Sequence, residues 1–142
     1  MEKKIRYTLG KEERLKSRKA IEELFASGKS FSLFPFKIIY QKNLAGEPQT
    51  TKYKPLQTAF SVSKKYFKKA TDRNRVKRLM REAYRLQKND LQISLQQSNK
   101  SLVVFIIYLG NELPDYKIVM DKMKAVLTRL KKITDEETIA TI

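Results

Sequence analysis

The chain has 142 residues, the size of a single domain, and its 31 lysine and arginine residues outnumber its 15 acidic residues, giving a formal charge of +16. Such an excess favours a polyanionic partner, nucleic acid first and an acidic membrane surface second, with a merely soluble basic protein as the alternative. Cysteine and histidine are absent, which excludes disulfides, sulfur-dependent zinc sites and the commonest general base.

The N-terminal segment, Met1 to Leu9, is charged and lacks the apolar stretch of a signal peptide. The longest apolar run, Leu102 to Leu109, is far shorter than a membrane span. We therefore expect a soluble, cytoplasmic protein.

The first predicted element is a helix over Ser17 to Ala26, where apolar residues recur at helical spacing and Gly28 follows as a C-terminal cap. Strict alternation from Phe34 to Gln41 then predicts a strand. Its uniformly apolar side, which we assign to the core, consists of Phe34, Phe36, Ile38 and Tyr40. Residues 43 to 55 have the composition of an exposed hairpin connection, and residues 45–55 look like an insertion in it.

A second alternating run predicts a strand over Leu56 to Lys64. A long helix should start near Arg73, capped by Thr71 or Asp72, and end near Asn89. Leu102 to Leu109 is expected to be a central strand buried on both faces, and Asp115 to Ile133 a closing helix. Residues 1–13 and 134–142 are expected to be flexible termini of this single domain. The order of elements indicates an α+β fold, a two-layer α/β sandwich of helices on a small mixed sheet.

The long central helix carries the densest positive charge in the chain. On a helical projection the apolar residues gather on one face, whereas Lys77, Arg78, Arg81, Arg85 and Lys88 gather on the opposite face. A solvated amphipathic helix is the alternative, but such a helix usually pairs Glu with Lys at four-residue spacing. Glu82 is the only acid from Arg73 to Arg85, so the pattern favours a surface that binds nucleic acid.

The first turn of this helix holds Arg73, Asn74 and Arg75. Cations are disfavoured there by the helix dipole, by roughly 0.3 to 1 kcal/mol each, so their presence suggests a functional role. The planar fork of arginine suits phosphate oxygens and base edges, and the amide of Asn74 can both donate and accept.

The run Ser61-Val62-Ser63-Lys64-Lys65, followed after a basic spacer by Arg73-Asn74-Arg75-Val76-Lys77-Arg78-Leu79-Met80-Arg81-Glu82-Ala83, resembles the signature of the protein component of bacterial ribonuclease P. Upstream, Arg14-Leu15, Ile21, Phe25 and Gly28-Lys29-Ser30 resemble the opening segment of the same family. The likeness covers roughly residues 14 to 85.

The resemblance implies the fold of the second domain of ribosomal protein S5, with an unusual left-handed βαβ crossover where general rules favour a right-handed one. It further implies that a catalytic RNA subunit supplies the active site and its Mg²⁺ ions, while the protein binds no cofactor alone, contributes no catalytic residue and helps to bind precursor tRNA.

The resemblance also assigns two surfaces. The residues expected to contact the RNA subunit are Lys64, Lys65, Arg73, Asn74, Arg75, Lys77, Arg78, Arg81 and Arg85. A cleft between the first helix and the sheet would receive the single-stranded 5′ leader of the substrate, through Ile21, Phe25, Lys37 and Ile39. Ile21 and Ile39 stand where some members have aromatic residues, so plain apolar contact could replace stacking, and ordinary core packing is the alternative for Ile21 and Phe25.

Two other functions stay open at this stage. A structural RNA-binding protein, such as a ribosomal one, could use the same basic helix without a processing role. An autonomous nuclease would depend on carboxylates alone, and Asp90, Glu112, Asp115 and Asp121 are scattered without motif spacing. The sequence does not indicate the oligomeric state.

Overall fold

The computed structural model describes residues 9–10, 13–43 and 55–140, with side chains described as far as Lys42 in the first long stretch and Asp135 in the second. Four strands and four helices follow one another along the chain. Their bounds are α1 Arg18–Ser27, β1 Lys29–Leu33, β2 Phe36–Asn43, β3 Leu56–Val62, α2 Ala70–Gln87, α3 Asn89–Gln97, β4 Ser101–Tyr108 and α4 Tyr116–Ala140.

The strands form one mixed sheet in the order β1-β2-β4-β3. Strands β1 and β2 are an antiparallel hairpin, β2 pairs antiparallel with β4, and β4 pairs in parallel with β3. Parallel neighbours cannot be joined by a tight turn, so α2 and α3 make the crossover from β3 to β4. The fold is therefore α+β with a mixed sheet, as expected from the sequence.

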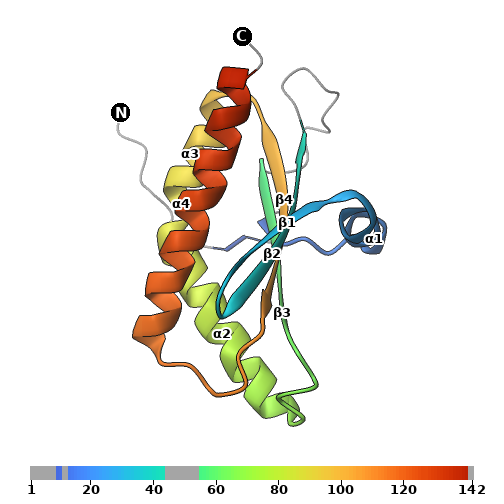
Figure 1. Cartoon of the computed structure of the whole chain (residues 1–142), viewed down its shortest axis with the longest axis vertical. Helices are drawn as coiled ribbons and strands as arrows, with labels where there is room; N and C mark the ends of the chain where they lie inside the picture. Colours follow the sequence, from blue (N-terminus) through green and yellow to red (C-terminus); the bar gives the residue numbers. More distant parts are fainter. Residues whose placement is uncertain (1–8, 11–12, 44–54, 141–142) are drawn as a thin grey trace.

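The two faces of the sheet are covered unequally. Helices α2, α3 and α4 lie side by side over one face, and α1 crosses the other (Figure 1). The main core lies under the helical layer and includes Phe36, Leu56, Met80, Ile106 and Met123, all at most 1% exposed. The predicted two-layer arrangement thus holds for α2–α4, whereas α1 adds a third, partial layer.

The first helix and the last strand agree closely with the sequence analysis. The hydroxyl of Ser17 accepts a hydrogen bond from the backbone N–H of Ala20 (3.2 Å), and the N–H of Gly28 closes the helix on the carbonyl of Leu24 (2.8 Å). Strand β4 is central, but its burial alternates between buried and half-buried residues. Full burial on both faces was wrong, because α1 covers only part of the second face.

Three elements differ from the expectations. Strand β1 was not predicted, since Lys29–Leu33 is short and mostly polar and depends on pairing with β2. Helix α2 begins at Ala70 with Lys69 as its N-cap, so neither Thr71 nor Asp72 caps it. Helix α3 follows α2 after a single residue, Lys88, and the sequence analysis assigned no element to most of its length.

The inner ends of the two ranges predicted to be flexible, 1–13 and 134–142, are ordered. Glu13 and Thr134, at those limits, are 6% and 2% exposed, and α4 continues to Ala140 rather than stopping at Ile133. The predicted insertion at 45–55 lies outside the described residues, except for Pro55. In the described part of the chain, no helix has the length and apolar character needed to cross a membrane.

Candidate nucleic-acid interface

The loop that precedes α2 is held in place by Arg73. Its Nη1 donates hydrogen bonds to the carbonyls of Phe67 (2.8 Å) and Lys68 (2.9 Å). Phe67 itself is buried and packs on Tyr108, with ring centroids 6.0 Å apart. These contacts fix the loop before α2, whose N-cap, Lys69, makes no side-chain hydrogen bond to the first turn of the helix. Arg73 therefore has a structural task that the sequence analysis did not foresee, and a purely RNA-contacting role for it is too simple.

The next polar side chains of α2 point outward. Asn74, Arg75, Arg78 and Arg81 are exposed, and Lys77 is half-buried. Along the same flank of the helix runs an open groove of about 660 Å³. It is lined by Leu9, Arg14, Arg75, Arg78, Leu79, Arg81, Glu82, Arg85 and Tyr116, and we call it the arginine groove.

The arginine groove contains five guanidinium groups and a single carboxylate. That carboxylate, Glu82, pairs with Arg85 (Nη2–Oε1 2.5 Å). The hydrogen bond from Arg85 outweighs desolvation and lowers the pKa of Glu82, and the same bond raises the pKa of Arg85. Among the described residues, no carboxylate lies within ion-pair distance of Arg14, Arg75, Arg78 or Arg81. Four of the five arginines thus keep a positive charge that internal acids do not offset, as a phosphate-binding surface requires.

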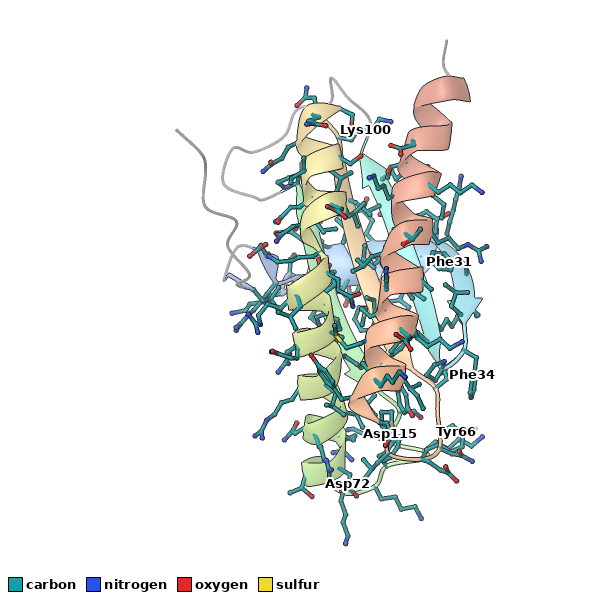
Figure 2. The ribbon with its side chains drawn as sticks, turned by 90° about the vertical axis from the view of Figure 1, so that its left-hand side faces the viewer. Phe31, Phe34, Tyr66, Asp72, Lys100 and Asp115 are labelled. Atoms are coloured by element: carbon teal, nitrogen blue, oxygen red, sulfur yellow. The ribbon has the colours of Figure 1, made fainter. Side chains whose placement is uncertain are left out.

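Lys64 and Lys65 lie in the loop between β3 and α2 and are exposed. The ammonium of Lys65 lies 5.6 Å from the ring centroid of Tyr66, itself 46% exposed. Figure 2 shows Tyr66 and Asp72 at the same end of the molecule, where α2 begins. The two lysines therefore extend the basic surface beyond the start of α2.

Lys88 does not belong to this surface, although the helical projection placed it there. It is 1% exposed, and its ammonium donates to the carboxylate of Glu13 in a buried ion pair. Gln92 donates to the same carboxylate oxygen (2.6 Å), and the backbone N–H of Gly10 donates to the other (2.6 Å). The projection failed because the segment before α1 crosses the end of α2 and covers it, which sequence periodicity cannot reveal.

A second surface lies on the opposite face of the sheet, beneath α1. Phe25 is 51% exposed and meets Phe105 of β4 edge to face, with centroids 5.0 Å apart. Ile21 is half-buried there, Ile39 is 8% exposed, and Lys37 is exposed on the same face of β2. The four predicted cleft residues are thus brought to one side of the sheet, with Ile39 and Ile21 belonging to a small apolar cluster.

Of the four residues predicted to form the apolar side of the first long strand, three are in the core and one is not. Phe36, Ile38 and Tyr40 are buried in the main core, as predicted. Phe34 is wrong as a core residue, because it lies in the turn between β1 and β2 and is 74% exposed. The strand begins two residues later than the alternation suggested, so Phe34 never joins the buried face.

Sequence reasoning missed three residues of these surfaces. Arg14 stands alone among mixed charges, and it reaches the arginine groove because Leu15 hydrogen-bonds to Thr58 beside β3 (3.1 Å). Tyr116 comes from the distant start of α4 and Phe105 from the interior of an apolar run. Arg14 was noted only as part of the family resemblance, and no local pattern marks Tyr116 or Phe105. Within the described residues, no group of three acidic side chains is placed to hold a metal ion.

Comparison with known proteins decides the family. The family model described as Ribonuclease P matches residues 9–131. The chain is 37% identical over 124 residues to the ribonuclease P protein component of Porphyromonas gingivalis, covering 87% of each chain. The chain belongs to the ribonuclease P protein family. The protein component of Chlorobium phaeobacteroides is also similar, at 32% identity over 136 residues, covering 89% of this chain and 92% of its own.

Solved structures agree with this assignment of the ribonuclease P protein. The RNase P protein from Thermotoga maritima superposes with a TM-score of 0.59 and 26% identity, covering 82% of this chain and 96% of its own. The Staphylococcus aureus RNase P protein has a TM-score of 0.60 at 18% identity, covering 84% and 95%. The latter shows the fold alone.

Proposed function

We propose that this ribonuclease P protein is the protein subunit of a ribonucleoprotein that removes the 5′ leader from precursor tRNA. The observation that carries the proposal is the arginine groove, in which Arg14, Arg75, Arg78 and Arg81 face solvent with no carboxylate partner among the described residues. Unpaired guanidinium groups on a rigid helix are suited to the phosphates of a folded RNA. The occupant of this groove is the catalytic RNA subunit.

In this assembly the chemistry belongs to the RNA. The protein contains neither histidine nor cysteine, so it lacks the side chains most often used for proton transfer near neutral pH. The RNA subunit would bind the Mg²⁺ ions and carry the catalytic groups. The protein contributes positive charge, which reduces the repulsion between two RNA molecules and so lowers the Mg²⁺ concentration that the reaction needs.

The surface beneath α1, where the family resemblance implies a cleft, is proposed to receive the single-stranded leader. Phe25 offers an exposed ring next to Phe105, and Lys37 supplies a cation on the same face. Stacking rings beside a positive charge are the usual means of holding a single strand without sequence preference. The largely buried Ile39 would support the floor of the cleft rather than stack on a base.

Three further properties follow from the family resemblance and form part of the proposal. The fold would be of the S5 domain 2 type, the β3–α2–β4 unit would be its left-handed crossover, and the protein would work in the cytoplasm. The parallel pairing of β3 with β4 across α2 is compatible with such a crossover.

The decisive experiment mixes the purified protein with a bacterial catalytic ribonuclease P RNA and precursor tRNA at low Mg²⁺. We expect correct 5′ processing only when protein and RNA are both present, and its loss with the double variant R75E/R78E. Binding to ribosomal RNA with no stimulation of cleavage would instead indicate a structural RNA-binding protein. Cleavage by the protein freed of RNA would indicate an autonomous nuclease.

A further inference from the structure

A second basic groove lies on the other flank of the helical layer, between α4 and β1. It has a volume of about 900 Å³, and its floor includes the buried rings of Phe31 and Tyr40. Its rim carries three cations of α4, namely Lys124, Arg129 and Lys132. Figure 2 shows Phe31 beside α4 on the side away from α2 and α3, so this groove is separate from the arginine groove.

The cations of the α4–β1 groove are accessible. Lys124, Arg129 and Lys132 are exposed, and within the described residues no carboxylate lies in ion-pair distance of any of them. The guanidinium carbon of Arg129 lies 4.5 Å from the ring centroid of Phe31, which fixes the cation over an aromatic face. Asp121 is the one acid that lines the groove. The groove therefore has a net positive charge, and one of its cations, Arg129, is held in position.

The spacing of these charges suits a phosphate chain. Lys124 and Lys132 are eight positions apart on one helix, which corresponds to roughly 12 Å at 1.5 Å per residue. A rim of this length can therefore contact more than one phosphate of an RNA strand. Over its full length α4 holds six cations and four acids, so the helix has a net positive charge.

We propose that the α4–β1 groove binds the phosphate backbone of a second segment of the catalytic RNA. The proposal rests on the proposed function. Both basic grooves flank the layer of α2, α3 and α4, whereas α1 lies on the opposite face of the sheet (Figure 1). A folded RNA that contacts α2 can therefore extend across α4 without reaching the surface beneath α1. It would then contact the protein along both flanks of the helical layer.

The test measures how the affinity for catalytic RNA alone depends on salt concentration. The variant K124Q/K132Q leaves Arg129 and its contact with Phe31 in place. It should lower the steepness of log affinity against log salt by roughly 1.4 to 1.8, because each of the two lost phosphate contacts removes roughly 0.7 to 0.9. The matched control is K16Q/K19Q, which removes two exposed lysines, one before α1 and one in its first turn, and should leave the slope unchanged.

The outcomes separate this inference from the proposed function. An unchanged slope in K124Q/K132Q, or an equal decrease in the K16Q/K19Q control, would overturn the groove assignment. Polyglutamate serves as a probe for an acidic protein partner. If K124Q/K132Q bound RNA like wild type but bound polyglutamate more weakly, the groove would bind an acidic protein and the inference would be wrong. If R75E/R78E also bound RNA like wild type, the proposed function itself would fail.

Cleavage of the RNA by a probe attached to the protein tests the same inference independently. The sequence contains no cysteine, so K132C and R78C each carry a single attachment point for a hydroxyl-radical source. We expect the two probes to cut the catalytic RNA at different nucleotides. Cuts from R78C with none from K132C above the cysteine-free background would contradict the second contact.

Discussion

The ammonium of Lys88 and the carboxylate of Glu13 form a buried ion pair that joins the N-terminal segment to the end of α2, with side chains 2% and 8% exposed. The carboxylate is further bonded by Gln92 and by the N–H of Gly10. Arg14, the next residue, lines the arginine groove. The ion pair thus sets where the N-terminal segment crosses α2 and, with it, where Arg14 enters the arginine groove.

Removing one partner of this ion pair should lower the stability of the folded protein. We expect K88M to lower the free energy of unfolding by about 3 to 5 kcal/mol, because it leaves the Glu13 charge buried without its cation. The double variant E13M/K88M should recover much of that loss, since neither charge remains. Urea denaturation of both variants measures this, and a K88M protein as stable as wild type would show that the pair contributes nothing.

The same carboxyl should make stability depend on pH. Burial by itself would raise the pKa of Glu13, but the hydrogen bonds from Lys88, Gly10 and Gln92 together lower it below the ordinary value of 4.5. Because the folded pKa is lower than the unfolded one, the stabilisation is complete above about pH 4.5 and is lost as pH falls through the folded value.

Denaturation curves between pH 7 and pH 3 check this. The wild type should lose stability more steeply on acidification than E13Q does. Parallel pH profiles for the two proteins would contradict the assignment to Glu13.

Arg73 and Arg75 should separate structure from binding. R73A removes the hydrogen bonds to Phe67 and Lys68 and should cost about 1 to 2 kcal/mol of stability. R75A removes an exposed side chain, so it should leave stability unchanged and weaken binding to the catalytic RNA. Thermal denaturation and filter binding on the two variants, side by side, distinguish these effects. Equal stability of both would show that the loop contact of Arg73 is dispensable.

The core contact between Thr58 and Tyr84 links β3 to α2 through their hydroxyl groups, 2.6 Å apart. Burial raises the pKa of Tyr84, so the phenol stays neutral and able to donate. Removing one partner leaves the other buried and unpaired, so T58V and Y84F should each lower stability by about 1 to 3 kcal/mol. The double variant should lose less than the sum of the two, and strict additivity would count against the bond.

The leader cleft can be tested by substrate choice. F25A removes the exposed ring that meets Phe105, and the loss of one stacked base corresponds to about 1 to 3 kcal/mol. We expect weaker binding of precursor tRNA to the reconstituted enzyme and unchanged binding of mature tRNA, which has no leader. The control S27A alters an exposed residue at the end of the same helix. Equal losses for both tRNAs would place Phe25 outside the cleft.

The periodicity of the sequence was sufficient to predict those elements whose burial follows their own pattern of apolar residues. Helix α1, the alternating strands β2 and β3 and the apolar strand β4 were all predictable, because burial on one face repeats every second or every third to fourth residue. The density of cations on α2, and the family likeness it carries, were likewise readable from the chain alone.

The tertiary structure decided which of those residues are free to bind. Lys88 and Arg78 look alike on a helical projection, yet the segment around Glu13 covers the first and leaves the second exposed. Arg14 and Tyr116 enter the arginine groove only through packing of segments distant in sequence. Electrostatic and burial energies depend on distances through space, and a one-dimensional pattern does not contain them.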